Sequence, residues 1–475
     1  MAAVRGAALQ MARDPYRVVL VGLIIMTVSR IHMQFPAFAK LRPALVFTIL
    51  GVILAFAKPG LLSRQPLLHT RPAKYMAGFA VVGLFSMFFG ISFGHTAVFI
   101  LNVYIKTLVF AALVILAVRG PRDLYTLVWA YVISAALLAY TSLFVFHLQQ
   151  YHGVQGIDFS RLAALATYDA NDAGLVMLVG IPLALLLAEM SGPKVKIFCL
   201  ALVAGIAAAI AKTGSRGAFL GLVSDGVALL LLVRAPMVRK IGVVAVAAIG
   251  LAVFAPPGYW DEMRTISNPK ADYNWSAKDG RRELIIRGIG YMTQYPLFGL
   301  GMSNFAKAEC EISEKAIFHA ENTFLRCTPP HNAYVEAGAE EGLPGLILWL
   351  LTIPGSVFAL IALRRRLPKQ WARGDAEERF LVKSTTYFAA SMAGYSVGSF
   401  FLTFAWTDIT YYVVAMNAGL YLAVEEKRRR NAMAARAAAG GAMPTATATV
   451  MAPGAGPTQA GPPGGRGARL RRRRA

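Results

Sequence analysis

Three residues with side chains capable of chemistry stand where helices are predicted to begin. Arg216 lies between glycines in the segment 213–217, which reads TGSRG and leaves backbone amides open ahead of a helix. Arg281 follows Gly280 and opens a helical pattern that runs to Tyr295, with Arg282 as its neighbour. His331 stands at the end of a long polar insert, before a short predicted helix. An arginine beside open amides at a helix N-terminus is a combination that binds anions such as phosphate.

Together these residue types predict one reaction. Two arginines can hold a diphosphate, in bidentate fashion where the geometry allows. A histidine, whose ordinary pKa is about 6.5, can take a proton from an attacking hydroxyl or orient it. Cationic groups would then stabilise the departing diphosphate. The pattern predicts glycosyl transfer from a polyprenyl-diphosphate donor at a membrane surface.

Each of the three residues also has a plainer interpretation. Arg216 could be an arginine that reaches from a span to the membrane surface. Arg281 could belong to a solvated helix face. A lone histidine beside a helix start is often structural.

Neither a metal nor another cofactor is expected. Asp169 to Asp172 have residue types that bind cations, but they stand where a span begins and are explained as its N-terminal cap. Glu336 and Glu340 are spaced as one helical face. The chain has no phosphate-binding loop of the Walker type, no zinc-type spacing and no dinucleotide-binding fingerprint.

The composition is that of an all-helical protein that crosses a membrane many times. Of 475 residues, 56% are hydrophobic and 15% are charged, against about 25% charged in soluble domains. The net charge is +23. In a soluble chain that charge would indicate nucleic acid, but here basic loops facing the cytoplasm explain it, and no nucleic-acid partner is expected.

Apolar runs long enough to span a bilayer predict about twelve transmembrane helices. The predicted organisation is a cytoplasmic N-terminus (1–16), nine spans (17–255), a large extracytoplasmic loop with short interfacial helices (256–343), three spans (344–424) and a basic, disordered cytoplasmic tail (425–475). Basic loops on alternate connections place both termini in the cytoplasm. Segments 148–171, 212–217 and 256–343 then face the periplasm or exterior, as does the predicted site.

Details of the large loop are predicted from local patterns. Leu284, Ile285, Gly288, Ile289 and Met292 form the apolar side of a helix that lies along the membrane surface. Gly342 and Pro344 end the short helix after His331. Cys310 and Cys327 lie in the same loop, and whether they form a disulfide stays open, because spacing does not test geometry.

The motifs resemble those of the O-antigen ligase and polymerase superfamily of bacterial membrane glycosyltransferases. The resemblance rests on the order of 215–217 (SRG), 280–281 (GR), 295–301 (YPLFGLG), 331–334 (HNAY) and 341–345 (EGLPG), and it covers about residues 165–425. It implies a metal-independent, inverting transferase of the cytoplasmic membrane. Its donor would be a glycan on undecaprenyl diphosphate. Arg216 and Arg281 would bind the diphosphate, with Arg282 as the substitute for Arg281, and His331 would be catalytic.

Two questions remain open at this level. The acceptor could be a lipid core or protein, as for a ligase, or a growing glycan, as for a polymerase. A different class, a transporter or lipid-linked glycan flippase, is raised by Lys106 and Asp225, which lie inside predicted spans. These two residues could instead form one buried structural pair.

Overall fold

The computed structural model describes residues 14–58, 60, 67–152, 158–162, 168–268, 275, 280–313 and 327–440. The chain divides into two units, residues 1–429 and 430–475. Helix α22 (Asp408–Gly440) continues into the predicted tail as far as Gly440, and the rest of that tail lies outside the described residues.

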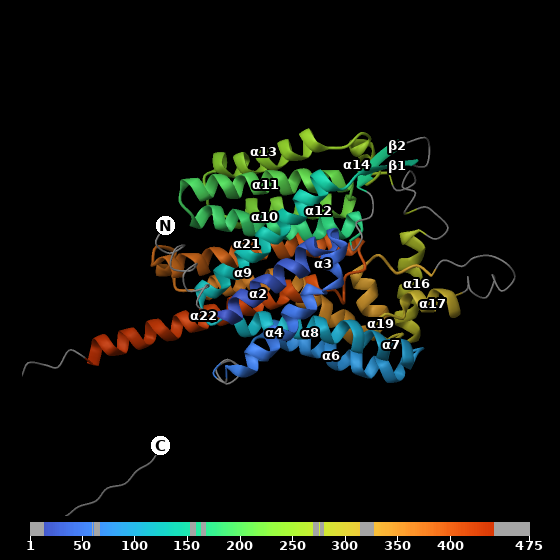
Figure 1. Ribbon diagram of the computed structural model, residues 1–475, viewed down its shortest axis with the longest axis horizontal. Helices are drawn as coiled ribbons and strands as arrows, with labels where there is room; N and C mark the ends of the chain where they lie inside the picture. Colours follow the sequence, from blue (N-terminus) through green and yellow to red (C-terminus); the bar gives the residue numbers. More distant parts are fainter. Residues whose placement is uncertain are drawn as a thin grey trace, which may run out of the picture. The chain divides into compact units, whose positions relative to one another are not determined.

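The described residues are almost entirely helical, as the composition predicted (Figure 1). The first half contains α2 (Pro15–Ser29), η1 (Ile31–Gln34), α3 (Pro36–Lys40), α4 (Pro43–Ala57), α6 (Arg71–Phe89), α7 (Phe93–Phe99), the π-helical η2 (Ile100–Tyr104), α8 (Ile105–Ala117), α9 (Pro121–Tyr140), the π-helical η3 (Thr141–Val145), and the strands β1 (Leu148–His152) and β2 (Asp158–Leu162). The second half contains α10 (Ala170–Met190), α11 (Pro193–Thr213), α12 (Arg216–Leu232), α13 (Met237–Phe254), α14 (Tyr259–Arg264), α16 (Arg281–Gln294), α17 (Phe305–Glu311), α19 (Ala333–Thr352), α20 (Pro354–Arg366), η6 (Lys369–Ala372), α21 (Ala376–Gly398), η7 (Ser399–Phe401) and α22.

Six helical segments are long and apolar enough to cross a membrane. They are Arg71–Phe89, Phe93–Ala117, Pro121–Val145, Ala170–Met190, Pro193–Thr213 and Ala333–Arg366. Shorter apolar helices lie at Pro15–Ser29, Pro43–Ala57 and Lys240–Phe254. These helices make the chain an integral membrane protein, while the count of about twelve spans stays a prediction.

Helix boundaries follow local signals. Proline is the first residue of several helices, including α2, α9 and α11, where its missing N–H costs nothing. Asp169 caps α10 through a capping box with Asp172, as the sequence predicted. The oxygens of Asp169 accept hydrogen bonds from the N–H groups of Asn171 and Asp172 at 2.6 and 2.9 Å. These acidic residues therefore have a structural role at a helix start.

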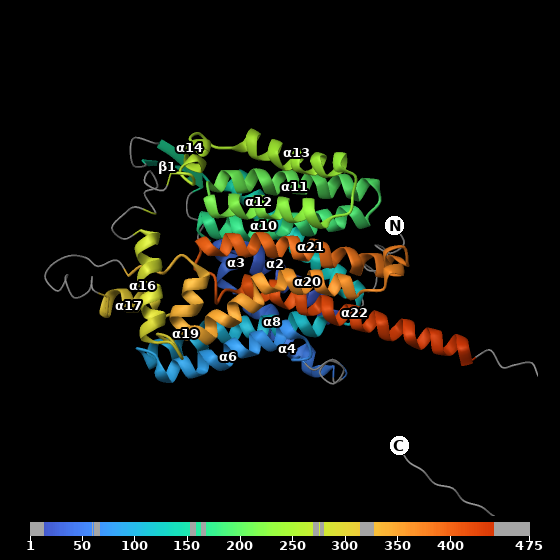
Figure 2. The ribbon, with the colours of Figure 1, turned by 180° about the vertical axis from the view of Figure 1, so that it is seen from behind.

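Long helices pack side by side as a bundle, with α10 and α21 in its interior (Figures 1 and 2). Helix α10 is buried along almost its whole length. The segments α14, α16, α17 and the antiparallel β1–β2 hairpin gather at one end of this bundle. They belong to the two connections that the sequence placed outside the membrane.

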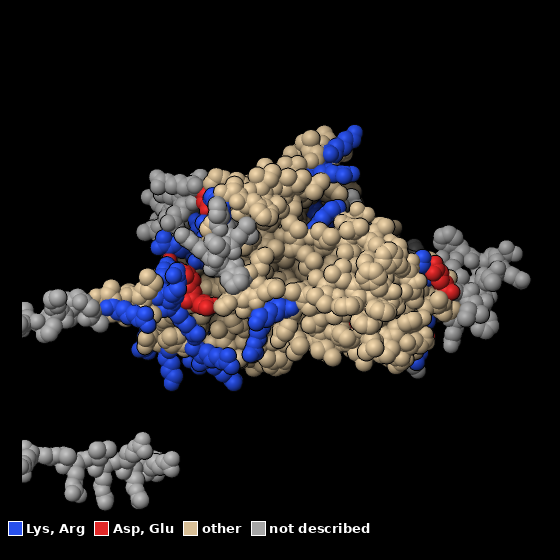
Figure 3. Space-filling model, turned by 90° about the horizontal axis from the view of Figure 1, so that it is seen from below, with Lys and Arg blue, Asp and Glu red and all other residues tan. Residues whose placement is uncertain are grey.

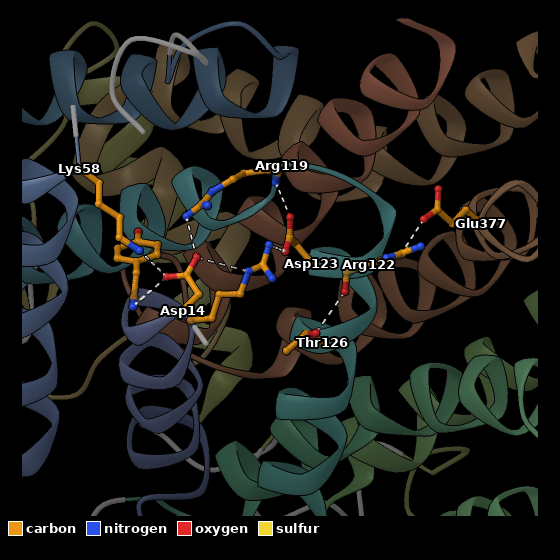
Figure 4. Close-up of polar contacts among 9 residues, drawn as sticks. Asp14, Lys58, Arg119, Arg122, Asp123, Thr126 and Glu377 are labelled. Carbon is orange, nitrogen blue, oxygen red and sulfur yellow. Dashed lines mark hydrogen bonds and ion pairs between the residues drawn. The ribbon is translucent and has the colours of Figure 1, made fainter. Parts of the chain in front are cut away.

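Ion pairs tie helix ends together on the side predicted to be cytoplasmic (Figure 4). Asp14 binds Lys58 at 2.7 Å and Arg119 at 3.2 Å, which joins the ends of α2, α4 and α8–α9. Partial burial alone would raise the pKa of Asp14, but these cations hold the pKa below its ordinary value. Figure 3 shows lysines and arginines concentrated toward one end of the face it draws, beside a broad uncharged middle, as the positive-inside rule requires.

Two local expectations need correction. Gly342 does not end the helix after His331, because α19 continues to Thr352 with a kink at Gly342, whose φ is 70°. On α16, Ile289 is 52% exposed, and Tyr291 instead shares the buried side with Leu284, Gly288 and Met292. The spacing 284, 288, 291 and 292 is the narrower helical stripe, from which position 289 is rotated away.

Candidate functional site

Arg216 is the first residue of α12 and is held in a buried turn. Gly214 ends α11 with a φ of 62°, a conformation that glycine adopts without strain. Ser215 caps α12 by accepting a hydrogen bond from the Ala218 N–H at 3.2 Å. Arg216 is 8% exposed. A span-end arginine reaching into open solvent would be more exposed, so this guanidinium is part of the packed structure.

Helix α14 supplies the partner of Arg216. The guanidinium Nη1 donates to Thr265 Oγ1 at 2.6 Å, and Thr265 Oγ1 donates to the Glu262 backbone carbonyl at 2.7 Å. The threonine hydroxyl thus has its own proton engaged and presents a lone pair to the arginine. This bond connects the large loop to the start of α12 and fixes one nitrogen of Arg216.

Two further charged residues reach the same turn and were missed from the sequence. A Cβ built on Gly214 would lie 3.0 Å from the Cβ of Arg161 on β2, and 3.1 Å from Oε2 of Glu262. The Ser160 N–H donates to the Pro257 carbonyl at 3.1 Å, so β2 is attached to the segment before α14. The only sequence signal was that both residues lie in connections predicted to be extracytoplasmic.

Arg281 and Arg282 open α16 in different environments. Arg281 is the first residue of the helix and is partly buried. Arg282 is exposed and pairs with Glu283 at 3.2 Å. Of the two arginines, Arg281 therefore stands closer to the packed interior, which agrees with its selection over Arg282.

His331 occupies a strained turn before α19. Its φ is 47°, a left-handed conformation that is uncommon for residues other than glycine. Its backbone N–H donates to Thr403 Oγ1 at 3.1 Å. Asn332 then caps α19 by accepting from the N–H groups of Tyr334 and Val335 at 2.9 and 3.1 Å. The turn fixes the backbone of a partly buried histidine at the helix start.

Packing brings these three helix starts to the same end of the bundle. Helices α16 and α19 run in the same direction, because Gly288 packs on Val335 and Gly338 packs on Met292. Their first residues, Arg281 and Ala333, therefore lie toward one end.

The start of α12 joins them through the segment after α21. Gly217 packs on Phe401, and Thr403, which follows closely in the chain, binds the His331 N–H. The structure links the three starts through this segment and records no direct bond between the side chains of Arg216, Arg281 and His331 among the contacts of the described residues.

The acidic residues of α19 anchor loops. Glu336 Oε2 accepts from the Ala405 N–H at 2.8 Å. Glu340 accepts from the N–H groups of Ser303 and Phe305 at 2.6 and 3.0 Å, and from Trp406 Nε1 at 2.6 Å. Both side chains are buried and lie on one helical face, as predicted. They hold the segments 303–305 and 405–406 against α19.

The glycine-rich segment before α17 is shaped for the same contact. Gly299 and Gly301 have φ values of 66° and 94°. A Cβ on Gly299 would lie 2.4 Å from the Glu340 carbonyl carbon, so a side chain has no room there. Asn304 Nδ2 binds the Leu300 carbonyl at 2.8 Å and Thr96 Oγ1 at 2.9 Å. These motif residues build the scaffold under the helix starts.

A disulfide joins Cys310 and Cys327, with their Cα atoms 5.4 Å apart. It connects the end of α17 to the segment that leads to His331. The question that the sequence left open is settled in favour of the bond. Within the part of the chain that the structure describes, no group of three or more His, Cys, Asp or Glu residues is arranged to hold a metal ion.

The charged residues inside predicted spans do not form the pair considered above. Lys106 is exposed, whereas Asp225 is 1% exposed and packs against Gly394 of α21. No ion pair between them is found among the described residues. The feature that raised a transporter function therefore consists of two separate groups.

Comparison with known proteins identifies the family. A family model described as O-antigen ligase matches residues 200–350, a segment that contains Arg216, Arg281, His331 and the buried glutamates of α19. This match confirms the resemblance: the chain carries the O-antigen ligase domain of the ligase and polymerase superfamily, whose members are glycosyltransferase-type membrane enzymes. No protein in a search of curated sequences matches the chain.

Proposed function

We propose that this protein transfers a glycan from undecaprenyl diphosphate to an acceptor hydroxyl on the outer face of the cytoplasmic membrane. The observation that carries the proposal is the arrangement of α12, α16 and α19. Their starts bear Arg216, Arg281 and His331, lie toward one end of the bundle, and fall within the segment matched to the O-antigen ligase family.

The arginines bind the donor in this proposal. Arg216 and the first amides of α12 face the diphosphate, where the positive end of the helix adds to the guanidinium charge. Arg281 contributes a second guanidinium from the start of α16. Charge builds up on the diphosphate as it leaves, and these cations stabilise it without a metal.

His331 acts on the acceptor. The acceptor oxygen attacks the anomeric carbon from the face opposite the diphosphate, and its proton passes to the imidazole. The new bond forms as the bond from the anomeric carbon to the diphosphate oxygen breaks, and that electron pair leaves with the diphosphate. The configuration at the anomeric carbon is therefore inverted.

The acceptor decides between two members of this class. A ligase joins the glycan to a lipid core or protein, whereas a polymerase extends a glycan that remains on its lipid carrier. The ligase reaction is the first choice because the matched family model is described as a ligase.

Incubation of the purified protein with a glycan on undecaprenyl diphosphate tests the proposal. With a chelator present, we expect release of undecaprenyl diphosphate and glycan on the lipid-core or protein acceptor. Longer glycans on the carrier would show a polymerase instead. Movement of intact donor across vesicles, without cleavage of the diphosphate bond, would overturn the transferase proposal.

A further inference from the structure

A second site lies in a cavity far from the helix starts described above. The cavity has a volume of about 560 Å³ and lies among α10, α11, α12, α13 and α21. Its walls are mostly aliphatic, and include Leu185, Leu222 and Val243. Arg216, Arg281 and His331 do not line it. The volume is that of a pocket for a sizeable organic molecule rather than for a few waters.

The cavity is open to an occupant because α13 packs on α11 and leaves space beside α12. Gly226 on α12 and Gly242 on α13 both line the cavity. A Cβ built on either glycine meets no atom within 4 Å. Neighbouring residues of α13 are strongly exposed, Val238 at 83% and Ile241 at 59%. In a membrane these surfaces lie against lipid, so a hydrocarbon chain is the available apolar occupant.

Lysines give the cavity a charged rim. Lys196 near the start of α11 and Lys240 near the start of α13 both line it. Lys240 Nζ donates to the Leu230 carbonyl at 2.6 Å, which positions the ammonium beside the end of α12 and leaves further N–H groups. Leu230 stands 14 residues after Arg216 on the same helix, which is about 21 Å along its axis. The rim therefore lies at the opposite end from the proposed donor site.

We propose that this cavity binds an anionic phospholipid, with an acyl chain between α12 and α13 and the phosphate on Lys196 and Lys240. The aliphatic wall takes the hydrocarbon, and the two ammonium groups match the charge of the head group. Its position at the predicted cytoplasmic end separates this ligand from the lipid-linked donor, whose diphosphate is proposed to bind near Arg216. The site goes beyond the proposed transferase function and does not depend on it.

Photocrosslinking in membranes tests the site. The full-length protein is reconstituted with phosphatidylglycerol that carries a diazirine on one acyl chain, and labelled peptides are identified by mass spectrometry. We expect labelling of α12 and α13 residues that line the cavity. Phosphatidylethanolamine with the same chain should label them several-fold less, because it has no net charge to pair with the lysines.

Matched variants separate the cavity from the general surface. Lys196→Ala with Lys240→Ala should reduce phosphatidylglycerol labelling several-fold, whereas Lys194→Ala, an exposed lysine of the same helix outside the lining, should not. Gly226→Leu should block the cavity. Gly205→Leu, whose Cβ also meets no atom but lies outside the lining, is the control.

Equal labelling by both lipids, or labelling that Gly226→Leu leaves unchanged, would overturn the proposal. Preferential labelling by a polyprenyl-diphosphate probe would also overturn it, because the site would then belong to the donor.

Discussion

At the scale of residues, the proposed site depends on how Arg216 is held. The guanidinium is buried and donates to Thr265, whose hydroxyl is turned by the Glu262 carbonyl. A hydrogen bond to a charged group contributes about 1.5 to 3 kcal/mol. Thr265 is therefore a positioning residue that acts through Arg216, and its effect can be separated from that of the arginine charge.

Substitution at Thr265 tests this role. Thr265→Val keeps the shape of the side chain and removes the acceptor, so we expect kcat/KM for the donor to fall about tenfold. Thr265→Ser keeps the hydroxyl and should restore most of the activity. The measurement is steady-state glycan transfer as donor concentration varies. Equal losses in the valine and serine variants would contradict a role through the hydroxyl.

The sequence predicted the chemistry-bearing residues but not their surroundings. Arg216, Arg281 and His331 were identifiable because arginine and histidine are unusual beside apolar runs. Arg161, Glu262 and Thr265 were missed because they lie in connections with no helical or strand period to relate them to α12. Their approach to Arg216 comes from the packing of two long connections, which a pattern along one chain does not encode.

At the scale of elements, apolar run length predicted the helices well, and helix interruptions were harder. The kink at Gly342 was expected as a helix end, because glycine and proline usually mark one. Here buried Glu340 and its bonds to Ser303, Phe305 and Trp406 hold the first part of α19 in place, and the helix resumes. Tertiary hydrogen bonds outweighed the local signal.

The disulfide gives an element-scale test of orientation. Disulfides persist in oxidising compartments, so the segment between α17 and His331 should face the periplasm or exterior. We expect a membrane-impermeant maleimide, added outside intact cells or spheroplasts, to label Cys310 and Cys327 only after reduction. Cys199 is buried and should stay unlabelled, and a Cys199→Ser variant removes it as a source of signal.

The outcome that contradicts this orientation is labelling only after the membrane is opened. Labelling without reduction would instead show that the two thiols are free in the membrane-bound protein.

At the scale of the whole molecule, the account separates two ends. Basic residues and their ion pairs, such as those of Asp14 with Lys58 and Arg119, gather where the sequence predicts the cytoplasm. The starts of α12, α16 and α19 lie toward the other end. Composition and the alternation of basic loops could predict this division, because charge must stay out of the hydrocarbon layer. The number of spans and the path of a glycan to the site depend on how helices pack, and they stay predictions.

The central claim is that His331 takes the proton of the acceptor, and its most direct test is glycan transfer by His331→Ala. The control is His69→Ala, which removes an exposed histidine that pairs with Glu425. Both variants should unfold at the temperature of the wild type. We predict that His331→Ala lowers kcat on the order of 10²-fold or more, with donor binding retained, and that His69→Ala does not. Transfer by a folded His331→Ala protein at the wild-type rate would contradict the account and leave His331 as a helix-start residue.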